Sequence, residues 1–254
     1  MNETLLSARG IVKRFAGFCA LDGVDLDVTQ GAIHGLIGPN GAGKSTFINV
    51  LAGQLRPSEG QIRLRGDSLV GLAPHEVVRR GVARSFQITS IFPGYTVYQN
   101  VQIALMAHAG HCGHWLRPAA PTLREETERL LETSNLLPDR ARVAGELAAG
   151  DRKRLEFAIS LASQPALLLL DEPTAGMSPS ERAMVTETIL RLNRELGMTV
   201  LFTEHDIEMV FGTAQRVTVL HQGRKLAEGA PRAVRSDARV QEVYLGGEAH
   251  AELP

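Results

Sequence analysis

Residues 38–46 are Gly38-Pro39-Asn40-Gly41-Ala42-Gly43-Lys44-Ser45-Thr46, a run of nine residues that fills every fixed position of the pattern GxxxxGK[ST]. The apolar segment 32–37 before it predicts a buried strand, and 47–51 opens a helix whose positive dipole end faces the loop. The glycines let backbone N–H groups turn inward toward phosphates, Lys44 adds a positive charge, and Ser45 offers a hydroxyl to Mg²⁺. This context argues against an ordinary glycine-rich turn. The sequence therefore predicts a nucleoside triphosphate site at 38–46.

The composition fits one enzyme-sized domain, or a core with a smaller subdomain, in 254 residues. The 27 basic and 28 acidic residues nearly cancel, so nothing suggests a protein that coats nucleic acid. The apolar runs are too short to cross a bilayer and the first residues do not resemble a signal peptide, so we expect a cytoplasmic chain. Cys19 and Cys112 are too few for a disulfide framework, and we expect Cys19 to be a small buried residue.

Strand and helix patterns divide the chain into three parts. Near the N-terminus, the predicted strands of a small antiparallel layer are 5–15, 24–28 and 61–65. In the middle, the predicted helices of a helical subdomain are 97–107 and 123–135. In the last part, the predicted strands 167–170 and 198–202 flank a helix with apolar residues along one face between 185 and 196. Strands that alternate with helices predict an α/β core.

Polar residues follow the predicted strands, at the edge where ligands bind in open α/β sheets. Asp171 follows the strand 167–170 and is predicted to hold Mg²⁺ through water, while Glu172 is predicted to polarise an attacking water. His205 ends the next strand and is placed to hydrogen-bond the γ-phosphate. Gln87, after a strand at 83–86, can reach Mg²⁺ and the water from the other side. Taken alone, the acidic pair fits a helix N-cap, the histidine a structural role, and the glutamine a solvated surface.

The sequence resembles the ATP-binding cassette (ABC) ATPases over essentially its whole length. The motifs that carry the resemblance stand in the family's order: an aromatic residue for adenine at Phe15, the phosphate loop, Gln87, a signature at Leu147-Ala148-Ala149-Gly150-Asp151, the segment Asp171-Glu172-Pro173-Thr174, a D-loop at Ala175-Gly176-Met177-Ser178, and the switch histidine His205. Their order and spacing make the match highly specific.

The resemblance implies an α/β fold of the P-loop NTPase (RecA-like) class, with an N-terminal antiparallel β layer and an inserted helical subdomain. It implies ATP and Mg²⁺ as cofactors. We expect a single ABC ATPase domain over 1–254, divided into a nucleotide-binding core at 1–90 and 164–230, a helical subdomain with the signature at 91–163, and a C-terminal tail at 231–254.

A narrower resemblance, to the ATPase subunits of branched-chain amino acid importers and their urea and amide relatives, rests on 175–177, 204–206 and the tail 227–246. It implies that membrane permeases dock short coupling helices into the groove beside Gln87. It also implies that a periplasmic solute-binding protein chooses the substrate. The chain would then be a peripheral protein on the cytoplasmic face of the inner membrane, without a nucleic-acid partner.

In ABC ATPases two subunits pair head to tail, and each ATP lies between one subunit's phosphate loop and the other's signature. A helix beginning near Arg152 is expected to present its N-terminus to the partner's ATP. Ala148 replaces the usual serine of the signature, Ala149 replaces a glycine, and Ser178 stands where the D-loop usually has aspartate. One phosphate contact is therefore lost. The partner can be an identical or a different ATPase, and we favour a heterodimer. With a different partner whose signature contains serine, this chain's Glu172 completes the stronger hydrolytic site.

Two functions other than transport are known for cassettes of this kind or fit a nucleotide-binding subunit. A soluble ABC ATPase acting on nucleic acid or the ribosome would resemble proteins with a long coiled-coil insertion, or with two cassettes joined by a basic linker. Here roughly a hundred residues separate Gly43 from Gly150, and there is one cassette. A regulatory subunit without turnover is disfavoured by the intact Glu172 and His205.

One cluster in the middle of the chain could bind Zn²⁺ or Cu: His108, His111, Cys112 and His114. Metal sites usually take ligands from two separate elements, whereas these residues lie within one short segment. We therefore expect a solvent-exposed, variable insert here rather than a metal site.

Overall fold

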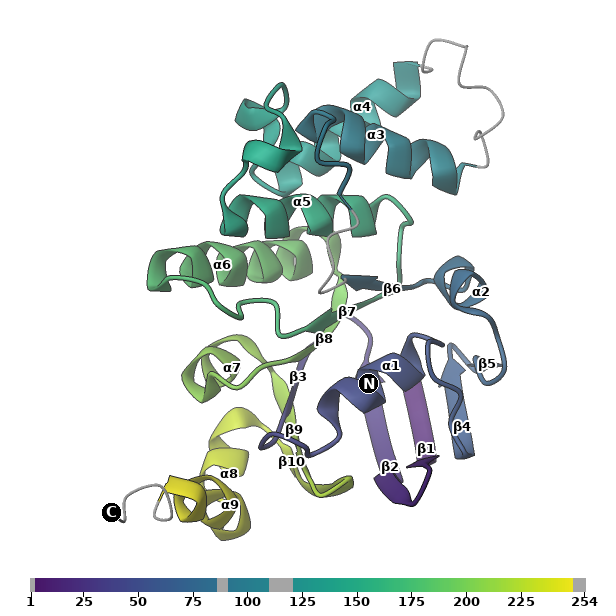
Figure 1. Cartoon of the computed structure of the whole chain (residues 1–254), viewed down its shortest axis with the longest axis vertical. Coiled ribbons are helices and arrows are strands. Elements are labelled where there is room, and N and C mark those ends of the chain that lie inside the picture. The colour runs from purple at the N-terminus through teal and green to yellow at the C-terminus, as the bar shows by residue number, and fades with distance from the viewer. Residues whose placement is uncertain (1–2, 86–90, 110–120, 249–254) are drawn as a thin grey trace.

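The computed structural model describes residues 3–85, 91–109 and 121–248, and this part of the chain forms two β-sheets with helices packed against them (Figure 1). The smaller sheet is antiparallel, with the strand order β2-β1-β4-β5. Its strands are β1 (Thr4–Phe15), β2 (Phe18–Thr29), β4 (Glu59–Leu64) and β5 (Asp67–Ser68). The predicted antiparallel layer is therefore confirmed.

Within the described residues the larger sheet has six strands in the order β10-β9-β3-β8-β7-β6. These strands are β3 (Ile33–Ile37), β6 (Val82–Ser85), β7 (Leu167–Asp171), β8 (Thr199–Thr203), β9 (Arg216–His221) and β10 (Arg224–Gly229). β3 is parallel to β8 and β9, and β7 is parallel to β6 and β8, whereas β10 is antiparallel to β9. The carboxyl ends of the parallel strands thus share one edge of the sheet.

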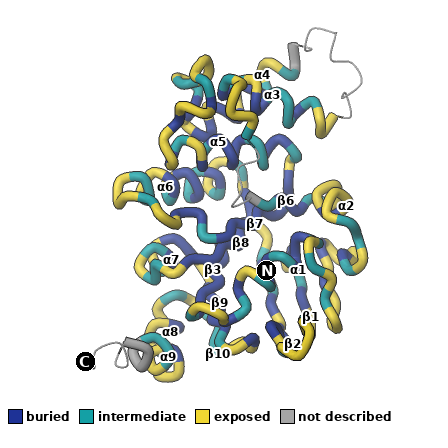
Figure 2. The backbone as a smooth tube through the Cα atoms, in the orientation of Figure 1, coloured by how far each residue is buried: buried dark blue, intermediate teal, exposed yellow. Residues whose placement is uncertain are grey.

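The central strands are buried on both faces, which explains their continuous apolar sequences (Figure 2). In β7, Leu168 and Leu170 belong to one hydrophobic core and Leu167 and Leu169 to the other, because successive side chains of a strand point to opposite faces. The second core also takes residues from the smaller sheet and from α1 (Lys44–Leu51) and α2 (Pro74–Arg79). The first core takes residues from α6 (Pro179–Leu196), α7 (Ile207–Thr213), α8 (Pro231–Arg235) and α9 (Ala238–Glu248).

Helices α3 (Val97–His108), α4 (Pro121–Thr133) and α5 (Ala149–Leu161) form a separate group above the larger sheet in Figure 1. Short 3₁₀ turns at Leu137–Asp139 and Ala144–Glu146 lie between α4 and α5. α3 begins at a capping box, in which the Thr96 hydroxyl accepts from the Gln99 N–H and the Gln99 side chain accepts from the Thr96 N–H. The predicted helices of the middle third are therefore confirmed.

Two expectations about local structure are wrong. α5 begins at Ala149 rather than near Arg152, because the backbone of Ala148 is already in the extended conformation of an N-cap. Cys19 is exposed, because it lies near the tip of the β1–β2 hairpin, where its thiol donates to the Leu21 carbonyl at 3.1 Å. Among the described residues, every helix is too short or too polar to cross a bilayer.

Candidate functional site

The phosphate loop connects β3 to α1, and glycine is required at two of its positions. Gly43, the N-cap of α1, has a φ of 100°, and a Cβ there would lie 2.7 Å from the carbonyl oxygen of Ala20. At Gly38 a Cβ would lie 2.2 Å from the carbonyl oxygen of Leu220. The loop is therefore held closely between β2 on one side and β9 on the other.

Lys44 is buried beside the phosphate loop. Its Nζ donates to the carbonyl oxygens of Gly38 and Pro39, at 2.7 and 3.1 Å. Burial lowers the pKa of Lys44, and the nearby carboxylates of Glu172 and Asp171 oppose this shift. No side-chain hydrogen bond from the described residues caps the N-terminus of α1, so its first N–H groups can bind an anion. The loop thus combines a cation with unpaired N–H donors.

The Asp171 carboxylate is the centre of a hydrogen-bonded cluster at the end of β7, and it is only 1% exposed. Its Oδ1 accepts from the Thr203 hydroxyl at 2.7 Å and from the Ser45 hydroxyl at 3.3 Å. Its Oδ2 accepts from Nη2 of Arg84 at 2.9 Å. Thr203 is the residue opposite Asp171 in the parallel pairing of β7 with β8. Strand register therefore brings these groups together.

The oxygen atoms of Ser45 and Asp171 fit a Mg²⁺ ion that arrives with a nucleotide. Magnesium is usually bound by one or two carboxylates, other hard oxygen ligands and substrate phosphates, rather than by an all-protein cage. The 3.3 Å contact between the Ser45 hydroxyl and Asp171 places two such ligands beside the phosphate loop. Among the described residues no group of three or more His, Cys, Asp or Glu side chains could hold a metal on its own.

Glu172 and His205 lie together at the same edge. Oε1 of Glu172 is 3.4 Å from Nδ1 of His205, whose side chain is 55% exposed. The backbone of Glu172 has a φ of 48°, in the left-handed region that non-glycine residues seldom adopt. Its N–H donates to the Thr203 carbonyl at 3.0 Å and is 3.1 Å from the Thr203 hydroxyl, which holds this strained turn in place. Backbone strain of this kind clusters at functional sites.

The structure adds polar residues that sequence reasoning missed. Glu204 is buried, and its carboxylate accepts from the N–H and hydroxyl of Thr174, at 2.8 and 2.7 Å, and from the N–H of His205 at 3.3 Å. It therefore ties the turn after β7 to the turn after β8. Thr203 and Arg84 hold Asp171, as described above. The available sequence signal was that Thr203 and Glu204 follow the predicted strand 198–202 and that Arg84 lies within the predicted strand 83–86.

The signature segment 147–151 lies on the other face of the larger sheet from the phosphate loop, since α5 contributes to the first hydrophobic core and α1 to the second. Ala148 has no side-chain group to cap α5. Instead, the N–H of Gly150 donates to Oε1 of Glu181, at 3.4 Å, from the first turn of α6. Ser178 is the N-cap of α6 and donates its hydroxyl to Glu181 at 2.7 Å. The Ser178 side chain and backbone and the Gly150 N–H lower the pKa of Glu181.

Phe15 and Gln87 are the two remaining predicted site residues near the nucleotide. Phe15 is 44% exposed, at the turn joining β1 to β2, and Nζ of Lys13 lies 5.1 Å from its ring centroid. The same hairpin reaches the phosphate loop through Ala20, beside Gly43. Gln87 lies outside the described residues, as do three members of the proposed metal cluster, residues 111, 112 and 114.

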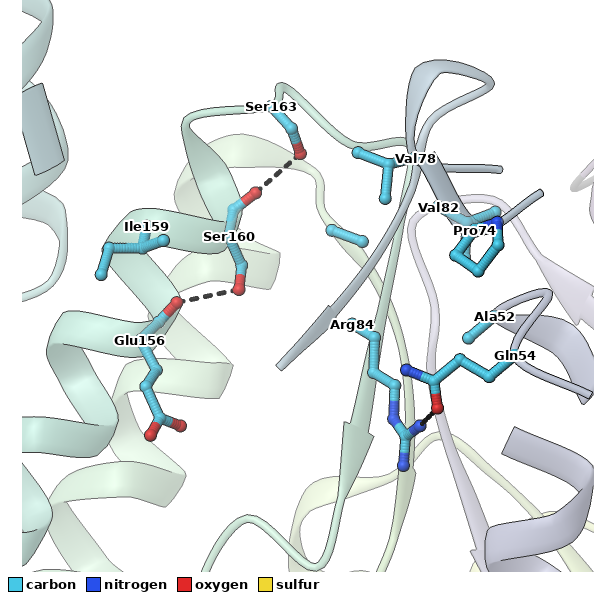
Figure 3. Close-up of a pocket in the computed structure, with 11 residues that line it drawn as sticks. Ala52, Gln54, Pro74, Val78, Val82, Arg84, Glu156, Ile159, Ser160 and Ser163 are labelled. Carbon is cyan, nitrogen blue, oxygen red and sulfur yellow. Dashed lines mark hydrogen bonds between the residues drawn. The ribbon is translucent and has the colours of Figure 1, made fainter. Parts of the chain in front are cut away.

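A groove of about 240 Å³ lies between α2, β6 and α5 (Figure 3). We call it the α2–α5 groove, and its lining includes Gln54, Val78, Val82, Arg84, Glu156 and Ser160. It lies beside β6, the last described strand before residues 86–90.

Comparisons with known proteins agree with this geometry. Residues 21–175 match the family model described as ABC transporter, and 224–250 match one described as branched-chain amino acid ATP-binding cassette transporter. The chain is 37% identical to the high-affinity branched-chain amino acid transport ATP-binding protein BraF of Pseudomonas aeruginosa, over 97% of this chain and 99% of BraF. It is 38% identical to the corresponding protein LivG of Escherichia coli K12, with the same coverage. A solved ATP-binding cassette of an ABC transporter in its ADP conformation has a TM-score of 0.85 and 30% identity, over 96% of this chain and 99% of that one.

Proposed function

The chain belongs to the ABC transporter family and is an ATP-hydrolysing subunit of a transporter, and we propose that this transporter imports branched-chain amino acids or the related amides and urea. The observation that carries the proposal is the similarity, at nearly full length, to two branched-chain amino acid transport subunits. The separate match of residues 224–250 to a branched-chain amino acid transporter model supports it.

ATP is proposed to bind with its β- and γ-phosphates in the loop 38–46. The N–H groups of the loop and of α1, and Nζ of Lys44, hold these phosphates. Ser45 and Asp171 would hold Mg²⁺, with Gln87 as a further contact, and the ion would supply positive charge to neutralise the phosphates. Phe15 stacks on the adenine, because its exposed ring lies at the hairpin that reaches the loop.

Glu172 is proposed as the general base of hydrolysis. Its carboxylate accepts a proton from the water that attacks the γ-phosphate, and His205 donates a hydrogen bond to that phosphate. The 3.4 Å contact between the two side chains and the strained backbone of Glu172 support these roles. The backbone N–H of Glu172 forms its hydrogen bonds with Thr203, which holds the turn. These bonds use neither oxygen of the Glu172 carboxylate.

The proposed partners rest on the family membership of the chain and on its altered signature. A second ABC ATPase subunit, different from this chain, pairs with it head to tail, so that the signature Leu147, Ala148, Ala149, Gly150 and Asp151 faces the partner's ATP. Membrane permeases dock in the α2–α5 groove, and a periplasmic solute-binding protein delivers the substrate. The chain is then a peripheral protein at the cytoplasmic face of the inner membrane.

A soluble ABC ATPase acting on nucleic acid or the ribosome is not favoured, because the near full-length relatives reported above are transport subunits. The test is reconstitution with the co-purifying permeases in vesicles loaded with ATP. We expect ATP-dependent uptake of labelled leucine, isoleucine or valine that Glu172→Gln abolishes. Intact ATP hydrolysis without uptake of these amino acids, or of amides and urea, would overturn the substrate class. Co-purification with ribosomes instead of permeases would overturn transport.

A further inference from the structure

The side chain of Arg84 reaches from the α2–α5 groove to the Asp171 carboxylate. It extends from β6, lines the groove and is 10% exposed. Its Nη2 donates to Oδ2 of Asp171 at 2.9 Å, and its Nη1 donates to the side-chain oxygens of Asn49 and Gln54. Asn49 belongs to α1, the helix that begins at the phosphate loop, and Gln54 lines the groove (Figure 3). The guanidinium of Arg84 therefore contacts the groove wall, α1 and the Asp171 carboxylate.

We infer that Arg84 is a positioning residue that orients the Asp171 carboxylate for Mg²⁺ and connects that carboxylate to the α2–α5 groove. The inference rests on the proposed roles of Asp171 and of the groove, and it extends them to a residue outside the nucleotide-binding motifs. A permease that shifts the wall of the groove would thereby act on the metal site through a single side chain.

The hydrogen bonds of Asp171 leave room for this role. An ionised carboxylate offers about four lone-pair positions. Thr203 and Ser45 use Oδ1, and Arg84 uses one position on Oδ2, so a second position on Oδ2 stays available to a water of the metal. Bonds to both oxygens also stop the carboxylate from rotating. A guanidinium suits the task because its donors lie in a rigid plane, whereas a lysine ammonium is a point charge on a flexible stem.

A purely stabilising role explains the contacts of Arg84 less well. Buried ion pairs are often replaceable by apolar groups without loss of stability. The Nε–H of Arg84 is also buried without an acceptor among the described residues, so the side chain keeps an unsatisfied donor while its other nitrogens are directed to specific oxygens. Partners that orient metal-binding side chains typically change metal affinity by about 10- to 100-fold when they are removed.

The test measures binding of a fluorescent ATP analogue, mant-ATP, to the purified full-length chain as Mg²⁺ is titrated, and again in excess EDTA. In Arg84→Gln the Mg²⁺ concentration that half-saturates mant-ATP binding should rise about tenfold or more. The affinity for mant-ATP in excess EDTA should change by less than about twofold. Arg84→Lys should fall between this variant and the wild type. Arg80→Gln is the matched control, because Arg80 is an exposed neighbour paired with Asp67, and it should behave as the wild type.

Gln54→Ala tests the connection to the groove, and it keeps the test decisive if Arg84→Gln does not fold. It removes an acceptor for Arg84 in the groove wall while leaving Asp171 and Arg84 in place, and should raise the half-saturating Mg²⁺ about two- to threefold. An unchanged Mg²⁺ titration in Arg84→Gln would overturn the positioning role, and an unchanged one in Gln54→Ala would overturn the connection. Failure of wild-type chain to bind mant-ATP would instead contradict the proposed nucleotide site.

Discussion

The phosphate-loop side and the signature side of this chain are built differently. At the phosphate loop, groups from α1, β6, β7 and β8 fix one another: Lys44 is bonded to its own loop, and Asp171 to Thr203, Ser45 and Arg84. At the signature, Ala148 supplies no side-chain cap to α5, and the N–H of Gly150 donates to the carboxylate of Glu181 on the next helix, at 3.4 Å.

The difference indicates which half of the proposed ATP site is already organised in this chain by itself. Electrostatic groups are most effective where they are held in place before the ligand arrives, as on the phosphate-loop side. The signature side has a helix N-terminus but lacks the hydroxyl that would cap it and contact a phosphate, and a carboxylate lies close by. We therefore expect substitutions on the phosphate-loop side to have larger effects than substitutions at the signature.

The largest effect is expected from Glu172→Gln. Hydrolysis should fall about 10²-fold or more, because general-base help is lost, while ATP binding stays nearly intact because the phosphate loop is unchanged. The measurement is ATP turnover with the permease partners, beside equilibrium ATP binding. Glu195→Gln, an exposed change on α6, is the control. Wild-type turnover in Glu172→Gln would remove Glu172 from catalysis and weaken the contrast between the two sides.

A second prediction concerns the strand that carries the phosphate loop. His34 on β3 is buried, with its Nε2 2.9 Å from the Thr218 hydroxyl, and burial lowers its pKa to about 4. The unfolded chain has the ordinary pKa of about 6.5, so between these values it binds a proton that the folded chain does not. The free energy of unfolding should therefore fall as the pH falls through about 6.5, by about 2 kcal/mol at pH 5.

Urea unfolding at pH 7.5 and pH 5 measures this loss. His34→Gln should lose less stability over the same range, because glutamine has no proton to gain, whereas His75→Gln, at an exposed position of α2, should follow the wild type. An identical loss in wild type and His34→Gln would show that other groups control the acid sensitivity of the phosphate-loop side.

The sequence was informative where a function depends on a short, continuous pattern. The phosphate loop and the pair Asp171 and Glu172 were predicted with their strands, because loop geometry and burial on both faces of a sheet are properties of neighbouring residues. The start of α5 was missed because Ala148 carries none of the side chains that usually mark a helix N-terminus. The exposure of Cys19 was missed because residue type says little about a position near a hairpin tip.

The supporting residues of the site could not be found in this way. Arg84 and Thr203 reach Asp171 only because β6, β7 and β8 are adjacent in the sheet and in a particular register. Glu181 reaches Gly150 only because α6 packs beside α5. Such contacts join residues far apart in the chain, and a single sequence shows neither the strand order nor the register that creates them.

A smaller effect is expected from Ala148→Ser on the signature side. The hydroxyl restores an N-cap for α5 and offers a hydrogen bond to the partner's γ-phosphate, each on the order of 1 kcal/mol. ATP affinity at the partner's site should rise about fivefold. The measurement is ATP-dependent association with the partner ATPase, with Ala148→Gly as a control that adds no hydroxyl.

The difference between the phosphate-loop side and the signature side can also be tested in transport. If the partner's signature contains serine, Glu172→Gln in this chain should damage transport more than the equivalent change in the partner. Equal losses from the two glutamate changes, together with no response to Ala148→Ser, would mean that the altered signature has no functional consequence.

The smallest effect is expected from Glu181→Gln. The Glu181 carboxylate lies at the N-terminus of α5, where the partner's γ-phosphate is proposed to bind, so its negative charge opposes that phosphate. Glutamine keeps an oxygen to accept from Gly150 but removes the charge. Because this side chain is near the surface, the gain in ATP-dependent association with the partner should be only about two- to threefold at low salt and should vanish at high salt. Glu187→Gln, an exposed change on the same helix, is the matched control, and an equal gain there, or one that persists in high salt, would show that Glu181 does not act on the phosphate.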